Sequence, residues 1–360
     1  THLNGEHGPL AVEPSFHDGC LRLPGRTSPV SAGEYAALLQ VLRKGLPDME
    51  LSADWVDSLL SLLESCTANV PSSTYTGESP DVSLYDHLKM TAAVGACISE
   101  YLLEAEETDY KARLFDHEAV FCGEAAFLMV TADMSGIQRF IYTVATAGAQ
   151  RSLRSRSFFL EVLMEHYVDE VLSACGLSRA NLIYSGGGHC YILLPNTGSA
   201  KEAADDCGAL MKNWLIDHYG TTLYFASAYV PCSANDLMNI PAEKSPYSSV
   251  FISLSRAISS AKLHRYSADE IRKLNSQPCE ESECKICGRA SDGEICRDCA
   301  VFVSIGKELV GGGKYIAVTK SPTGGVDWEL PSLENGSVWL NFTDDVKSAD
   351  IIRFHTKNDD

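Results

Sequence analysis

Four cysteines in the last quarter of the chain have the residue type and spacing of a metal site. They form two C-x2-C pairs separated by eight residues in the segment CKICGRASDGEICRDC, and they are Cys284, Cys287, Cys296 and Cys299. Each pair predicts a turn whose two thiolates point at one ion. Four soft thiolates in tetrahedral geometry suit zinc, and four protein ligands leave no position open for water. We therefore expect a structural zinc ion, the alternative being two disulfides or inert thiols.

A second candidate is the segment NLIYSGGGHCYILLPN, residues 181–196, in which two apolar runs flank three glycines and His189. Glycine loses more backbone entropy on folding than any other residue, so three in a row are costly to order. Either the chain turns sharply here, or a ligand must approach the bare backbone. The two possibilities make different demands on the elements around the glycines.

The apolar patterns around the glycines predict a ferredoxin-like unit. AAFLMVTAD is strand-like and ends in Asp133, a helix capped by Ser135 follows, and a longer helix ends at Gly176. The longer helix has one apolar stripe, made of Phe159, Leu163, Tyr167 and Val171. The two runs beside the glycines are strands, KEAADDCGALMKNWLIDHYG is a helix, and TTLYFASAYV is a strand. Leaving aside the extra short helix, this order is the ferredoxin-like βαββαβ arrangement of an α+β protein. The glycines then form the tight turn between the second and third strands.

The whole chain of 360 residues divides into four predicted parts. Residues 1–112 show helical periodicity, including a helix that Ser83 caps. Residues 113–232 form the ferredoxin-like unit, and residues 233–300 hold linker helices and the four-cysteine zinc domain. Residues 301–360 are rich in Gly, Val, Thr and Trp and predict short strands.

Composition places the chain in a reduced compartment. Thirteen cysteines are present, and those outside the cluster are scattered singly. The start, THLNGEHGPL, is no signal peptide, so buried thiols in the cytoplasm are expected. No apolar run approaches the ~18 residues of a membrane span. The chain opens on Thr1 rather than Met, as a fragment of a longer protein would.

The net charge of −19 predicts poor general binding to nucleic acid. A local basic strip or a basic partner subunit is the exception. Arg151, Arg154 and Arg156 lie at a predicted helix start, where the helix dipole disfavours them, so they are candidates to face phosphate. A solvated charged face is the alternative.

Ferredoxin-like palms that polymerise or cyclise nucleotides use acids at the first strand end and in the central hairpin to hold two Mg²⁺ ions. Asp133 stands where the first acid belongs, but the hairpin reads Ser185, Gly186, Gly187, Gly188 and His189. A lone carboxylate cannot hold two divalent ions. The segment is thus a catalytically inactive nucleotide-binding palm or a plain ferredoxin-like domain with a tight turn. Local spacing alone favours the plain domain, because a glycine turn is a weak signal.

A resemblance to a known family favours the nucleotide-binding palm over the plain domain. SLYDHLKMTAA, ADMSGIQRFIYT, LRSRSFFLEVLMEH, SGGGHCYILLPN and the C-x2-C pairs follow one another as in the large subunit of type III-A (Csm) CRISPR effector complexes. The likeness runs from Leu51 to Cys299. Members of that family typically have an HD nuclease domain, a degenerate first palm, a zinc domain, a second palm with GGDD and a helical C-terminal domain. They are implicated in cleaving single-stranded DNA and in making cyclic oligoadenylates from ATP when target RNA is bound.

This chain departs from the family pattern at both ends. No GGDD occurs, and GGVDW at 324–328 is not one. The adjacent His17 and Asp18 lack the further histidines of an HD site, and we interpret them as a chance pair. Asp86 and His87 are interpreted as a helix-start pair. The chain therefore resembles the middle of the family protein and is predicted to be inactive alone.

The resemblance also implies ligands and partners. The nucleotide surface comprises Asp133, Ser135, Gly136, Ser185, Gly186, Gly187, Gly188 and His189. The helix start at Ser135 offers free N–H groups for phosphate. ATP and Mg²⁺ are expected as ligands of the complete two-palm site, and the second palm, the other Csm subunits, CRISPR RNA and target RNA as partners. Two alternatives are a self-sufficient nucleotidyl cyclase, which the missing acids argue against, and a zinc-stabilised interaction module without a nucleotide role.

Overall fold

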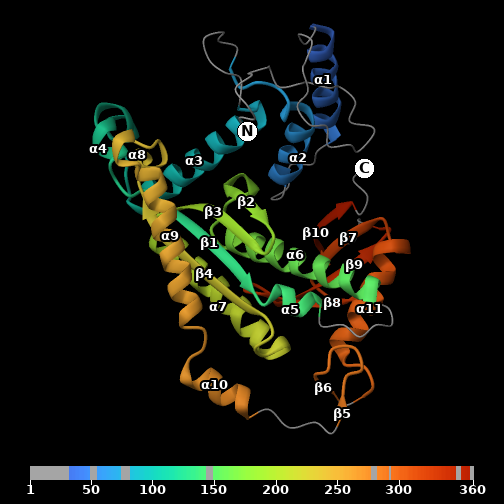
Figure 1. Ribbon diagram of the computed structural model, residues 1–360. Helices are drawn as coiled ribbons and strands as arrows, with labels where there is room; N and C mark the ends of the chain where they lie inside the picture. The colour runs from blue at the N-terminus through green and yellow to red at the C-terminus, as the bar shows by residue number, and fades with distance from the viewer. Residues whose placement is uncertain are drawn as a thin grey trace.

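The computed structural model describes residues 32–48, 55–73, 82–142, 149–276, 282–291, 293–345 and 350–356 (Figure 1). Helices and antiparallel sheets are combined in it, which is the predicted α+β class. His17 and Asp18, interpreted above as a chance pair, lie outside the described residues. None of the described helices is long and apolar enough to cross a membrane.

Helices make up the described N-terminal region, as its periodicity predicts. The elements are α1 (Ala32–Gly45), the 3-10 helix η2 (Leu46–Asp48), α2 (Trp55–Thr67), α3 (Leu84–Glu104), the π-helix η3 (Ala112–Asp116) and α4 (Glu118–Cys122). Ser83 caps α3, since its Oγ accepts a hydrogen bond from Asp86 N at 2.9 Å and donates one to the Asp86 carboxylate at 2.8 Å. Both the predicted cap and the helix-start role of Asp86 are confirmed.

A four-stranded antiparallel sheet lies at the centre of the molecule (Figure 1). Its unit consists of β1 (Phe127–Ser135), α5 (Ile137–Tyr142), α6 (Ala149–Ala174), the 3-10 helix η4 (Arg179–Asn181), β2 (Leu182–Gly186), β3 (His189–Pro195), α7 (Gly198–Tyr219) and β4 (Tyr224–Cys232). The strand order is β2-β3-β1-β4, so the predicted βαββαβ arrangement is present. Because β1 is central and pairs with β3, Asp133 lies directly opposite His189.

Helices α6 and α7 cover one face of this sheet. Alternate residues of β1, such as Leu128 and Val130, enter this layer, because successive side chains of a strand point to opposite faces. The apolar stripe predicted on α6 is buried here and comprises Phe159, Leu163, Tyr167 and Val171. Periodicity alone therefore identified this side of the core.

Between β4 and the cysteine cluster the structure describes four further helices, and one of them covers the opposite face of the sheet. They are α8 (Ala234–Leu237), the 3-10 helix η5 (Ala242–Lys244), α9 (Pro246–Leu263) and α10 (Ala268–Asn275). Leu254 of α9 and Cys97 of α3 pack with Met129 of β1 in a second core. Figure 1 shows α9 running along β1 and β4, so its last turn reaches the end of β1 that carries Asp133.

The C-terminal region begins with a helix that we did not expect from the sequence. We expected short strands after residue 300, but α11 (Arg297–Gly311) crosses that predicted boundary. Phe302 and Ile305 lie one helical turn apart and are buried in the core beside α6. The domain boundary at 300 stays a prediction, but the helix joins the cysteine cluster to the central unit.

Strands do follow α11, and they form a second antiparallel sheet in the order β10-β7-β9-β8. The strands are β7 (Tyr315–Thr319), β8 (Trp328–Ser332), β9 (Gly336–Thr343) and β10 (Ile351–Thr356), while β5 (Ser282–Glu283) and β6 (Ala290–Ser291) form a small hairpin in the cysteine cluster. Trp328 packs on Phe159 of α6 with ring centroids 4.0 Å apart. The second sheet therefore shares a core with the ferredoxin-like unit.

Candidate functional site

Asp133 lies near the end of β1 and is held by side chains from two other elements. Lys262 Nζ, on the last turn of α9, is 2.6 Å from Asp133 Oδ1. His189 Nδ1, on β3, is 3.3 Å from Asp133 Oδ2, and its Nε2 is 3.3 Å from Thr131 Oγ1. Ser135 donates a weak hydrogen bond to Asp133 at 3.5 Å. Thr131 is buried, but the other side chains of the cluster are partly exposed, so the cluster is accessible to a ligand.

The surroundings of Asp133 favour its ionised form and offset the negative charge of the carboxylate. Burial by itself raises the pKa of Asp133, but the hydrogen bonds and positive charge supplied by His189 and Lys262 outweigh it and hold the pKa below its usual value. The carboxylate oxygens are thus engaged by nitrogen donors. No acidic cluster able to hold a metal occurs here among the described residues. The cluster presents an ammonium to an anionic ligand and is unsuited to hold two Mg²⁺ ions.

The glycine segment is a tight turn that also leaves bare backbone accessible. Gly186 pairs with His189 across the hairpin, and Gly187 and Gly188 adopt φ values of 62° and 80°, which L side chains rarely adopt. A Cβ on Gly188 would lie 2.4 Å from Ile137 Cδ1, whereas a Cβ on Gly187 would meet nothing within 4 Å. The turn requires both residues, and Gly187 in addition leaves its backbone open to a ligand.

Gly136 joins β1 to α5 in a conformation that only glycine fits. Its φ is 93°, and a Cβ there would lie 2.1 Å from the backbone oxygen of Thr222. The helix begins at Ile137, and Ser135 is the last strand residue, paired with Tyr224. The expected cap at Ser135 is therefore misplaced, because the glycine connection intervenes and the Ser135 hydroxyl binds Asp133. The six-residue α5 also weakens the expected phosphate site.

Ser185 lies apart from the other predicted residues. Its hydroxyl donates to Glu165 of α6 at 2.5 Å, on the opposite face of the sheet from His189. Asp133, Ser135, Gly136, Gly186, Gly187, Gly188 and His189 do lie together at one end of the sheet. Alternation along β2 explains the difference, because neighbouring residues of a strand point to opposite faces.

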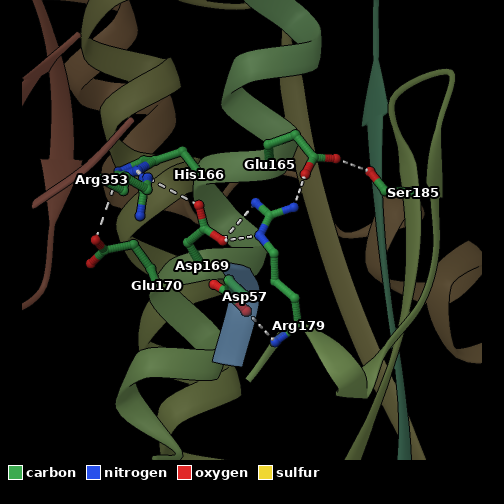
Figure 2. A network of polar contacts seen from close by, with 8 residues as sticks. All are labelled: Asp57, Glu165, His166, Asp169, Glu170, Arg179, Ser185 and Arg353. Atoms are coloured by element: carbon green, nitrogen blue, oxygen red, sulfur yellow. Dashed lines mark hydrogen bonds and ion pairs between the residues drawn. The ribbon is translucent and has the colours of Figure 1, made fainter. Parts of the chain in front are cut away.

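Figure 2 shows that Ser185 ends a polar network linking the hairpin to the second sheet. Arg179 bridges Glu165 at 2.5 Å and Asp169 at 2.6 Å. Asp169 also pairs with Arg353 of β10 at 3.0 Å, and Arg353 donates to Nδ1 of His166 at 2.5 Å. Burial and the Arg353 charge lower the pKa of His166 to about 3, so its ring is neutral and donates from Nε2 to the Pro331 carbonyl.

Replacing Arg179 with Met is expected to destabilise the fold. Glu165 would remain partly buried without its cation and Asp169 would keep only Arg353, which we expect to cost about 2–3 kcal/mol. Urea unfolding measures the loss. Arg272→Met is the matched control, because its pair with Asp269 is exposed and should contribute under about 0.5 kcal/mol. Equal losses in the two variants would show that the network does not stabilise the hairpin.

Lys262 is the site residue that sequence analysis missed. It lies 129 positions from Asp133 in the chain, and nothing in the segment around it indicates which partner it meets. Thr131 was missed as well, although its position two residues before Asp133 on a strand places it on the same face. That alternation could have identified Thr131 from the sequence, whereas Lys262 can be identified only once the path of α9 is known.

The three arginines that were expected to face phosphate do not form one ligand-facing group. Arg156 is buried, with only 2% of its surface exposed, and donates to the Phe140 carbonyl at 2.7 Å and to Cys299 Sγ at 3.4 Å. It is therefore a core residue, and its assignment to phosphate was wrong. Arg154 is exposed and keeps that prediction, while the side chain of Arg151 is outside the described part of the structure.

The four cysteines of the cluster converge as the spacing predicts. Their sulfur atoms all lie within 4.8 Å of one another, and those of Cys287 and Cys296 are 3.7 Å apart. All four are free thiols, so the disulfide alternative is absent. Cys284 Sγ accepts a hydrogen bond from Cys296 N at 3.3 Å, as a metal-bound thiolate does. The donor set fits a tetrahedral zinc ion, which would tie the β5–β6 hairpin to α11.

The chain is similar in sequence to known proteins. Residues 126–277 match the family model of the Csm1 subunit domain B. The CRISPR system single-strand-specific deoxyribonuclease Cas10/Csm1 (subtype III-A) of Mycobacterium tuberculosis is 47% identical over 265 residues, which cover 70% of this chain and 33% of that protein. The chain is homologous to part of the Csm1 subunit. The Cas10/Csm1 protein of Enterococcus italicus is 41% identical over 288 residues, covering 78% of this chain and 38% of its own length.

Solved Csm1 structures show the same fold. A Csm1–Csm4 cassette in complex with one ATP aligns with a TM-score of 0.67 and 27% identity, over 91% of this chain and 39% of that chain. A cassette in complex with cA4 aligns with a TM-score of 0.65 and 26% identity, over 91% of this chain and 38% of that chain. The chain thus spans well under half of the Csm1 proteins it matches.

Proposed function

We propose that the chain is the catalytically inactive half of a nucleotide site in a type III-A CRISPR effector subunit. Its ferredoxin-like unit acts as a degenerate palm that scaffolds cyclic oligoadenylate synthesis by a second, GGDD-bearing palm. The observation that carries the proposal is Asp133, the lone acid of the site, neutralised by Lys262 and His189 beside an open glycine turn. The ATP and cA4 bound to the solved Csm1–Csm4 cassettes support it.

Each residue of the proposed half-site has a physical role. Gly187 leaves backbone room for a base or ribose, because a Cβ at this position would stand in open space. Lys262 presents an ammonium at this end of the sheet, and such a donor suits phosphate oxygens, while both ring nitrogens of His189 are engaged by Asp133 and Thr131. Asp133 orients both. In this proposal Mg²⁺ is held by the acids of the second palm, because the half-site lacks a second carboxylate.

The partners proposed for the complete protein are the other Csm subunits, CRISPR RNA and target RNA. One observation also favours the alternative of a zinc-stabilised interaction module. Large apolar side chains are exposed on the neighbouring helices around α4 and α8, with Phe115 the most exposed at 74%. The others in this group are Val120, Met238, Ile240 and Tyr247. Such a group is suited to a partner protein and does not exclude the nucleotide role.

Product analysis tests the proposed function. The chain incubated with ATP and Mg²⁺ is expected to make no cyclic oligoadenylate, and the chain together with a fragment carrying the second palm is expected to make it. Gly187→Leu in the pair should reduce product strongly, because the side chain would occupy the open space over the turn. Product from the chain alone, or full activity of the Gly187→Leu pair, would overturn the proposal.

A further inference from the structure

Arg156 is a buried cation that has no carboxylate partner among the described residues. Only 2% of its surface is exposed, and its Nε has no hydrogen-bond partner. The rings of Phe140 and Phe302 lie 4.8 Å and 5.3 Å from its guanidinium carbon. Aromatic faces offset part of the cost of burying a charge, but a buried charge usually also has an anionic partner.

The hydrogen bonds of Arg156 join two places. One nitrogen donates to the carbonyl of Phe140 on α5, the helix that follows Gly136 and packs against the glycine turn. Another nitrogen donates to Cys299 Sγ, 3.4 Å away in the cysteine cluster. Arg156 therefore contacts both the metal cluster and the helix beside the candidate nucleotide surface.

A zinc ion bound to four thiolates leaves a net charge of about −2 on the centre. Another guanidinium near the cluster, that of Arg289, differs from Arg156 because it has a carboxylate partner, Asp298, at 2.7 Å in addition to its contact with Cys296 Sγ at 3.9 Å. We propose that the zinc–thiolate centre is the counter-charge of Arg156, and that Arg156 in this way fixes α5 to the zinc centre. The inference rests on the proposed structural zinc and assigns a role that the zinc proposal alone does not contain.

Zinc affinity of matched variants tests the inference. In Arg156→Met, competition with a chromogenic chelator is expected to show zinc affinity reduced roughly 10–100-fold, the usual effect of losing a group that binds a metal ligand. Arg156→Lys keeps the charge but cannot donate to both partners, and should fall between wild type and Arg156→Met. Arg154→Met, on the same helix but exposed, should keep wild-type affinity.

The outcomes separate the two proposals. A wild-type protein that contains no zinc by metal analysis overturns both. Zinc at one ion per chain, with the affinity unchanged in Arg156→Met or reduced as much in Arg154→Met, overturns only the role of Arg156.

A measurement on the wild-type protein keeps the inference testable if Arg156→Met does not fold. Hydrogen exchange is followed before and after zinc is removed with a chelator. Faster exchange is expected in α5, residues 137–142, as well as in the cluster itself. Faster exchange confined to residues 282–300 would show that Arg156 does not transmit the state of the metal centre to α5.

Discussion

Cys284→Ser is expected to abolish zinc binding and to destabilise the protein by more than about 4 kcal/mol, the range associated with losing a structural metal. The effect should be large because Cys299 of the cluster lies on α11, whose Phe302 packs on Phe159 in the main core with ring centroids 5.1 Å apart. Losing the metal therefore loosens a helix of the core as well as a surface hairpin. Metal analysis and thermal unfolding measure the two effects.

Cys122→Ser is the matched control for this prediction. Cys122 is a free, partly buried cysteine outside the cluster, so its replacement should leave the zinc content unchanged and alter stability by less than about 1 kcal/mol. If Cys284→Ser retained one zinc per chain, the four-cysteine site would be wrong. If it lost zinc without a change in stability, the cluster would not support α11.

Gly136→Ala is expected to have an effect of similar size, over about 3 kcal/mol, on the free energy of unfolding. The added methyl would lie 2.1 Å from the Thr222 backbone oxygen, at a φ of 93°. This backbone atom lies two residues before β4 and cannot move aside without disturbing the pairing of Ser135 with Tyr224. Steric overlap and backbone strain therefore add. Urea unfolding at equilibrium measures the change.

Gly187→Ala separates the two causes. Gly187 also has a positive φ, of 62°, but nothing lies within 4 Å of its added Cβ. The free energy of unfolding of Gly187→Ala should fall by only about 1 kcal/mol, the cost of a side chain at a positive φ. If Gly136→Ala cost no more than Gly187→Ala, the close approach of Gly136 to Thr222 would not restrict this position.

Local patterns predicted most of the ferredoxin-like unit. The apolar run of β1, the stripe on α6 and the glycine turn are each set by residues near in sequence, and the structure has all three. The spacing of the cysteines likewise predicted their convergence. The start of α11 was missed because the composition of residues 301–360, rich in β-forming types, outweighed the helical spacing of Phe302 and Ile305.

Two of the remaining features depend on contacts between distant segments. Lys262 reaches Asp133 only because α9 folds across the sheet, and no local pattern encodes that path. Arg156 looked like a phosphate ligand because charged side chains are usually exposed, but two aromatic rings and the cysteine cluster enclose it. Ser185 was grouped with its neighbours in sequence, whereas the alternation along β2 turns its side chain to Glu165.

Equilibrium binding of ATP is the most direct test of the half-site. The zinc-loaded chain is expected to bind ATP weakly and saturably, and Lys262→Met should reduce the affinity several-fold because it removes a cation and leaves Asp133 to repel phosphate. Lys307→Met, at an exposed position on α11, should leave the affinity unchanged. No binding by the wild-type chain, or the same affinity in Lys262→Met as in wild type, would contradict a nucleotide half-site at Asp133, His189 and Lys262.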